Sequence, residues 1–257
     1  MKPRMPPGTT VFVPVLALAG LALAACGGGA TGPGGDALEP TRILAIGVAR
    51  QDASPDQPAE GYLAFFYDLD ADSLLRAEAA INGTTLSSPF APVIIDGLLY
   101  FQGAEVTSGT SYRLAARVET PEGPVDVQSA AEVVPSLFGI DVPARHTSGQ
   151  PLTVRWTATP DAEKVNVSAG SGFAIDVPAS QTSVTIPAEA FAGIEAGETL
   201  EIEVTAYNTF YAPVFAGINS LANAETLAGQ LAVVDNIEGA LGAFGAATTV
   251  GALVTIE

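Results

Sequence analysis

The chain has one cysteine, one histidine and only 10 Lys and Arg residues among its 257 positions. One cysteine cannot form an internal disulfide, and one cysteine with one histidine cannot supply the four ligands of a structural zinc site. The 28 Asp and Glu residues leave a formal net charge of −18. Such a surface repels phosphate backbones, so we exclude nucleic acid as a partner because the electrostatic attraction that supplies most of that affinity is missing.

The N-terminus carries an apolar run that is too short to cross a bilayer. Lys2 and Arg4 precede a stretch from Val11 to Ala25 of about 15 residues, whereas a transmembrane helix needs about 20. A positive beginning, a short apolar stretch and small residues at its end are the parts of a signal peptide. We therefore expect residues 1–25 to be removed on export.

The end of this stretch explains the lone cysteine. Leu23-Ala24-Ala25-Cys26 resembles the lipobox of bacterial lipoproteins. The resemblance implies that Cys26 carries acyl chains such as palmitate and becomes the first mature residue; a chance cysteine after an ordinary signal peptide is the alternative. Two or three acyl chains anchor a protein almost permanently, since each buried methylene contributes about 0.8 kcal/mol. Gly27 stands where inner-membrane lipoproteins carry aspartate, which implies the outer membrane of the cell envelope as the destination.

The mature chain begins with a glycine-rich segment and continues with strand-like patterns. Residues 26–40 have little to bury, and we expect the acylated cysteine and a flexible tether there. From Thr41 onward, short runs rich in β-branched and aromatic residues recur about every 8 to 12 positions, which is typical of β-sandwiches. Asn82-Gly83 predicts a hairpin turn. Apolar residues alternate with polar ones in two clear cases: Tyr112, Leu114, Ala116 and Val118, then Leu152, Val154 and Trp156.

We predict an all-β fold with two tandem sandwich domains, residues 41–135 and 136–257. The second contains a C-terminal insertion with a short helix around Ser220 to Leu231, and a last strand from Ala247 to Ile256 completes its sheet. Because alternation places one face of each strand in a core, Trp156 is the expected anchor of the second core.

Two segments support a more specific resemblance. Thr107–Leu114 resembles the turn into the sixth strand of fibronectin type III and related immunoglobulin-like domains, where a tyrosine caps the corner. Ala196–Ile202 takes the same place in the second half with Leu200 instead of the tyrosine, and Trp156 matches the second-strand tryptophan. Separately, Asn236–Gly245 resembles a glycine-spaced segment of uncharacterised outer-membrane lipoproteins.

Three aspartates form a candidate metal site. Asp68, Asp70 and Asp72 could offer oxygen ligands to calcium, the one cofactor that the sequence suggests. Ser73 and Ala79 stand where an EF-hand needs glycine and glutamate, so an EF-hand is excluded. The alternative is a solvated turn between two strands.

Three aromatic residues form a candidate binding site. Tyr207, Phe210 and Tyr211 follow the strongest strand pattern of the second half in a loop-like setting. Aromatics at the end of a sandwich can stack on sugar rings or anchor a protein partner. The alternative is that they close the end of the sandwich.

We expect no enzymatic activity. We predict that His146 lies in a solvated loop without a partner motif, and that the acidic strip Glu198, Glu201 and Glu203 lies on the outward side of a strand. The function expected is that of a membrane-anchored extracytoplasmic lipoprotein acting as a structural or protein-binding module. The alternative is a glycan-binding accessory of a carbohydrate-uptake or envelope system. The expected partners are the membrane, through the acyl chains, and an unidentified envelope protein or glycan.

Overall fold

Strands supply the regular structure of the chain, as its alternating patterns predict. The computed structural model describes residues 42–53, 61–71, 73–90, 99–136, 138–170, 172–209 and 236–257. Within these ranges the helical structure is limited to one short 3-10 turn, η1 (Ala188–Phe191). The described part of the chain is therefore all-β. The helix expected at Ser220 to Leu231 lies outside the described residues.

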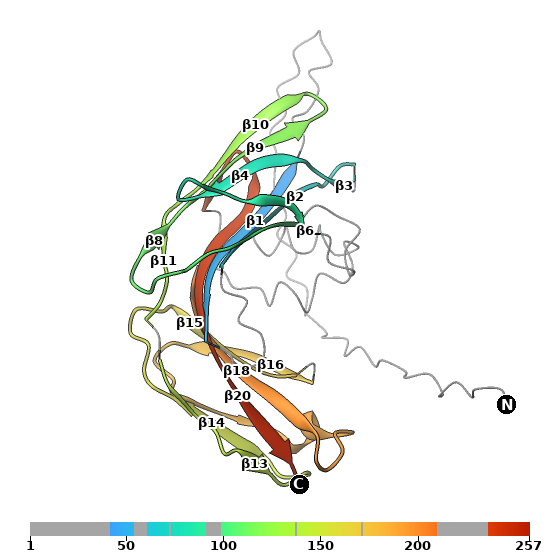
Figure 1. The fold of residues 1–257 in the computed structure, drawn as a ribbon, viewed down its shortest axis with the longest axis vertical. Helices are drawn as coiled ribbons and strands as arrows, with labels where there is room; N and C mark the ends of the chain where they lie inside the picture. Colours follow the sequence, from blue (N-terminus) through green and yellow to red (C-terminus); the bar gives the residue numbers. More distant parts are fainter. Residues whose placement is uncertain are drawn as a thin grey trace, which may run out of the picture. The chain divides into compact units, whose positions relative to one another are not determined.

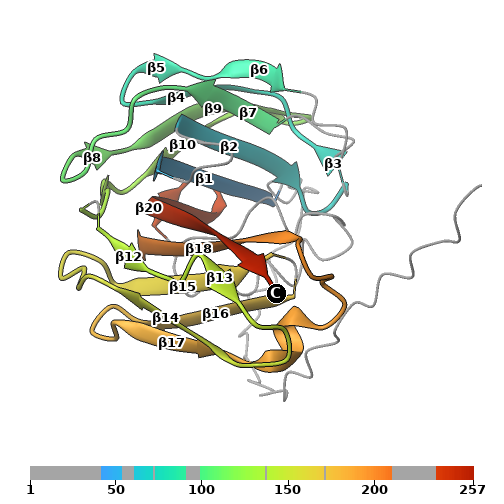
Figure 2. The same ribbon diagram turned by 60° about the horizontal axis from the view of Figure 1, so that its bottom comes forward.

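One sheet of ten strands crosses both halves of the sequence (Figures 1 and 2). Two short strands attach beside its main path, β13 (Arg145–His146) on β20 and β3 (Ser73–Leu74) on β2. The main path runs in the order β16 (Phe173–Pro178), β15 (Lys164–Ala169), β18 (Thr199–Asn208), β20 (Leu241–Ile256), β1 (Ile43–Asp52), β2 (Gly61–Asp68), β7 (Leu99–Gly103) and β6 (Ser87–Phe90).

Three smaller sheets accompany the large one. The five-stranded sheet has the order β19 (Ile237–Glu238), β10 (Gly123–Ser129), β9 (Leu114–Thr120), β4 (Ala77–Ile81) and β5 (Thr84–Thr85). The three-stranded sheet has the order β12 (Ile140–Asp141), β14 (Leu152–Trp156) and β17 (Ser183–Ile186), and β11 (Glu132–Val133) pairs with β8 (Ser111–Tyr112). The predicted hairpin turn joins β4 to β5, with positive φ at Asn82 (47°) and Gly83 (78°).

Two hydrophobic cores lie between the large sheet and the smaller ones. Core 1 contains residues of β1, β2 and β20 together with residues of β4, β9 and β10. Core 2 contains residues of β15, β18 and β20 together with residues of β14 and β17, among them Trp156, which is 5% exposed. The predicted alternation is confirmed, since Tyr112, Leu114, Ala116 and Val118 are buried and the residues between them are exposed.

The strand β20 is longer than predicted and belongs to both cores. It begins at Leu241 instead of Ala247, and its first part pairs in parallel with β1, from Leu44 opposite Leu241 to Asp52 opposite Thr249. Its later part pairs antiparallel with β18. The added strand residues were hidden by glycines, which usually indicate a turn. Here a Cβ on Gly242 would lie 1.7 Å from the carbonyl oxygen of Ala45, so glycine permits a close approach of two backbones.

All described residues belong to one compact unit, residues 39–257. The division into 41–135 and 136–257 stays a prediction. Core membership follows that division except at the C-terminal strands, because Ile237, Phe244 and Ala246 pack in core 1 while Val254 and Ile256 pack in core 2. Because side chains alternate along a strand, the even-numbered residues of β20 point to one face of the sheet. On that face, those near its start pack in core 1 and those near its end pack in core 2.

Candidate functional site

Several predicted functional residues lie outside the described ranges. They are Cys26, Asp72, Phe210 and Tyr211. Lipidation at Cys26 and the contributions of the other three therefore stay predictions. Asp68, Asp70 and Tyr207 can be placed.

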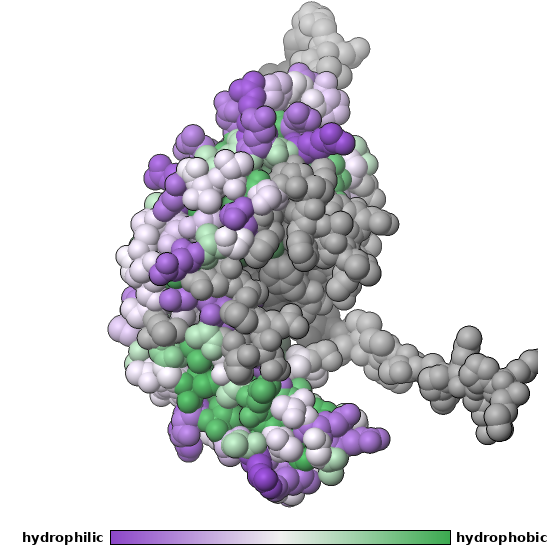
Figure 3. Space-filling model, viewed as in Figure 1, coloured by the Kyte–Doolittle hydropathy of each residue, from purple (hydrophilic) through white to green (hydrophobic). Residues whose placement is uncertain are grey.

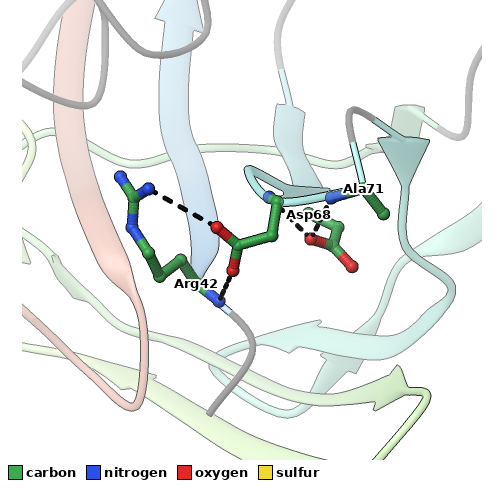
Figure 4. Close-up of polar contacts among 4 residues, drawn as sticks. Arg42, Asp68 and Ala71 are labelled. Atoms are coloured by element: carbon green, nitrogen blue, oxygen red, sulfur yellow. Dashed lines mark hydrogen bonds and ion pairs between the residues drawn. The ribbon is translucent and has the colours of Figure 1, made fainter. Parts of the chain in front are cut away.

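The first two aspartates of the candidate calcium site form a hydrogen-bonded turn after β2 (Figure 4). One carboxylate oxygen of Asp68 accepts hydrogen bonds from the backbone N–H groups of Asp70 and Ala71, each at 2.9 Å. The Asp70 carboxylate accepts from the backbone N–H of Arg42 at 3.1 Å and pairs with its guanidinium at 3.5 Å. The described residues contain no group of three or more His, Cys, Asp or Glu that could hold a metal. The calcium site, which also needs Asp72, stays a prediction.

The third placed residue, Tyr207, lies within β18 and not in the loop that the sequence predicts. Its side chain is 4% exposed, which leaves no ring face open for a sugar. Its hydroxyl donates a hydrogen bond to the carboxylate of Asp176 on β16. Burial, and secondarily the charges of Asp176 and Glu163, raise the pKa of Tyr207 far above its ordinary value. Tyr207 therefore holds the sheet together instead of presenting an aromatic surface.

A row of polar side chains that the sequence did not predict crosses the large sheet on the face opposite the cores. This face is identified by alternation, because Ala45 and Ala49 of β1 point into core 1 and the even-numbered residues point away. We call this row the polar strip; it comprises Arg50, Asp52, Asn166, Asp176, Glu203, Thr205, Tyr207 and Thr249. In one register row, Asp52 lies opposite Thr249, Thr249 opposite Thr205, and Thr205 opposite Asn166.

Direct contacts connect the members of the polar strip. The Arg50 guanidinium lies 2.5 Å from the carboxylate of Asp52 and 3.4 Å from that of Glu203. The hydroxyls of Thr205 and Thr249 share a buried hydrogen bond of 2.8 Å. Asn166 donates to Asp176 at 2.8 Å. Because these bonds link β1, β20, β18, β15 and β16, they oppose any slip of one strand against the next.

The composition of the polar strip indicates a role in register and not in catalysis. A slip by one residue would turn Arg50 and Asp52, which are 9% and 7% exposed, into core 1. Burying those charges without their partners costs several kcal/mol, so the correct register is strongly favoured. Two features of the sequence could have revealed the strip. Arg50 and Asp52 continue the alternate positions of Leu44, Ile46 and Val48, and Thr205 and Tyr207 alternate with core residues of β18.

The tyrosine corner implied by the fibronectin type III resemblance is present. The hydroxyl of Tyr112 accepts a hydrogen bond from the backbone N–H of Thr107 at 2.9 Å. Its ring, 5% exposed, lies beside that of Tyr62 with 5.6 Å between centroids. Burial, and secondarily Tyr112, raise the pKa of Tyr62. The corner thus fixes the chain before β9 against core 1.

His146 differs from its prediction as a solvated loop residue. It lies in β13, which pairs with the end of β20, and it is 8% exposed. Its ring packs on Phe191 with 4.7 Å between centroids, and its Nε2 lies 2.9 Å from the carbonyl oxygen of Gln150. The prediction failed because two residues of strand give no periodic signal. These contacts join no carboxylate to the ring, so they describe a packed histidine at the edge of core 2.

Two of the depressions on the described surface lie against strands of the smaller sheets. The larger of the two, of about 400 Å³, is lined by residues of β10 and β19 and by Arg113. The smaller, of about 340 Å³, lies along β12 and β14. Hydrophilic residues dominate the end of the β9–β10 hairpin (Figure 3). In the middle of the same hairpin, Arg117 lies opposite Asp126, and their side chains are 59% and 78% exposed. In the described ranges, no helix is long and apolar enough to span a membrane.

Comparison with known proteins finds a limited likeness to solved structures and nothing among family models or curated proteins. No protein-family model matches the chain, and no curated protein matches it. Among solved structures, the fibronectin(III)-like modules of CbhA from Clostridium thermocellum match at 14% identity with a TM-score of 0.27. That match covers 83% of this chain and 94% of the other. These comparisons assign the chain to no family.

Proposed function

We propose that the protein is a membrane-anchored extracytoplasmic lipoprotein whose β-sheet unit serves as a non-catalytic structural or protein-binding module. The observation that carries the proposal is the position of the single cysteine, directly after a signal-like stretch and directly before a glycine-rich tether. With Gly27 after Cys26, the outer membrane is the proposed location.

The start of the folded unit fits an anchored module. β1 begins at Ile43, so about 17 residues separate the lipidated cysteine from the first strand and reach about 60 Å at most. The pairing of β20 with both β1 and β18 supports a module role. Because this pairing joins the two halves of the chain in one hydrogen-bonded sheet, a partner bound to one half is also linked to the other half. We further propose that the sheets form two fibronectin type III-like sandwiches, on the support of the Tyr112 corner and the buried Trp156.

Metabolic labelling with palmitate tests the anchor. The wild-type chain is expected to incorporate label, to shift to a smaller size and to fractionate with membranes. Cys26→Ser is expected to remain unlabelled and at the size of the precursor. Label that enters both proteins equally, or neither, would contradict the proposal.

The glycan-binding alternative has less support than the module role, because Tyr207 is buried in the sheet. A glycan array probed with the purified wild-type chain separates the two functions. Binding that is lost in Tyr211→Ala but kept in Tyr62→Phe would establish the alternative, and an array without binding is the result that the module role predicts.

A further inference from the structure

We infer that the fold delays its own completion until β20 is available, so that the chain stays incompletely folded for as long as its C-terminal segment is withheld. This inference rests on the proposed function, since a protein exported with a signal peptide crosses the membrane before it folds. The device consists of the position of one strand: β20 follows every other described strand in sequence but occupies the interior of the large sheet.

The central position of β20 makes both cores depend on it. Without residues 236–257, β1 lacks its parallel neighbour and β18 lacks its antiparallel neighbour, which opens the large sheet into two pieces. Core 1 loses Phe244 and Ala246, both fully buried, and core 2 loses Val254 and Ile256. The five-stranded sheet also loses its edge strand β19. Each half is therefore left with an unpaired strand edge and a gap in its core.

The distance along the chain makes this pairing late. Leu44 and Leu241 lie opposite each other although roughly 200 residues separate them. Long-range parallel pairing is slow because loop-closure entropy must be overcome before the contacts form. Within the first half, by contrast, β1 with β2 and β9 with β10 are neighbours in sequence. Local hairpins can thus form early while the sheet that unites them waits for β20.

Specific contacts dock the C-terminal segment at one position. Within the segment, the side chain of Asn236 donates to the carbonyl of Phe244 at 2.8 Å and accepts from its N–H at 2.9 Å, which ties the start of the segment to β20. Toward the rest of the chain, the backbone N–H of Ala130 donates to the carbonyl of Asn236 at 2.7 Å. The side-chain amide of Asn236 also donates to the carboxylate of Glu132 at 2.8 Å. Gly242, with φ of 143°, lets the strand lie against the backbone of Ala45. These contacts explain why another apolar strand would not pair between β1 and β18 as well as β20 does.

The full chain tethered to the ribosome tests the inference without a membrane. Two C-terminal linkers are compared, one short enough to keep β20 inside the exit tunnel and one long enough to release it. Protease is added, and the survival of the first half is followed with an antibody against residues 61–71. Release of β20 is expected to lengthen the survival of the first half by about tenfold or more, because proteolysis follows the population of the open state.

Two variants in the long-linker form keep the result specific. Gly242→Ala blocks the approach to Ala45 and is expected to leave the first half as sensitive as the short-linker form. Gly109→Ala, which meets no atom within 4 Å, is expected to remain resistant. Equal cleavage of the two wild-type forms, whether fast or slow, would overturn the inference. Palmitate labelling reports the anchor independently, so the failure of one proposal is distinguishable from the failure of the other.

Discussion

Core 1 and core 2 are built from similar strands but recruit them from different distances. Every member of core 2 comes from residues 138–256, whereas core 1 combines residues 43–134 with Ile237, Phe244 and Ala246. The tyrosine corner belongs to core 1, and the only tryptophan belongs to core 2. The first half of the chain, although translated first, therefore depends for its completion on the segment farthest from it in sequence.

The largest expected effect breaks the long-range part of core 1. In Gly242→Ala the new methyl group would meet the Ala45 carbonyl oxygen at 1.7 Å, and φ of 143° is unfavourable for alanine. We expect a loss of about 4 kcal/mol or more in unfolding free energy, measured by urea denaturation. Gly109→Ala, with φ of 72° and open space, should lose only about 1 kcal/mol. Equal losses would mean that the approach of β20 to β1 is unimportant.

The next largest loss of unfolding free energy is expected when one aromatic side chain is removed from a core. Phe244→Ala in core 1 and Phe191→Ala in core 2 both empty a fully buried position and should each cost about 3 to 5 kcal/mol. If the halves are coupled through β20, each variant shifts one common transition in urea. Two separate transitions, of which only one moves in each variant, would show that the cores unfold independently.

The tyrosine corner should contribute less. Tyr112→Phe removes the hydroxyl that accepts from the Thr107 N–H, and leaving that partly buried donor without a partner costs about 1 to 3 kcal/mol. In the second half, Leu200 stands at the corresponding position and packs on core 2. Leu200→Phe serves as the control and should not reproduce a loss due to the missing hydroxyl. A Tyr112→Phe protein as stable as the wild type would remove the corner as a stabilising feature.

The smallest expected effect appears at high pH. Because burial raises the pKa of Tyr62 and Tyr207 in the folded protein, the folded state keeps its protons at a pH where the unfolded chain releases them. Stability is then full below the ordinary tyrosine pKa near 10 and falls as the pH rises above it. We expect each tyrosine to lower the unfolding free energy by about 1 kcal/mol or less between pH 10 and 11, measured by chemical denaturation. Tyr207→Phe should reduce the slope, and an unchanged slope would contradict the assignment.

Local patterns in the sequence predicted most of the strands. The alternation around Leu114 and Val154 matches the observed burial. The Asn82-Gly83 turn and the burial of Trp156 were also predicted. These features succeed because each depends on residues within one strand or one turn.

Features that depend on distant strands were not predictable in this way. The sequence shows Arg50 and Glu203 separately, and only the order β1, β20, β18 brings their side chains to 3.4 Å. Glycines in a sequence usually indicate a turn, and the close approach of Gly242 to β1 leaves no local pattern. The start of β20 at Leu241 was therefore not predicted. The prediction that His146 is solvated was wrong for a related reason, since its ring packs on Phe191, which is distant in sequence.

The unity of the two cores can be measured directly in the wild-type protein. Trp156, the only tryptophan, reports core 2 by fluorescence, and hydrogen exchange in β1 and β2 reports core 1. During urea unfolding at equilibrium, the two signals should change with the same midpoint, because β20 belongs to both cores. A fluorescence transition well separated from the loss of protection in β1 and β2 would contradict the account.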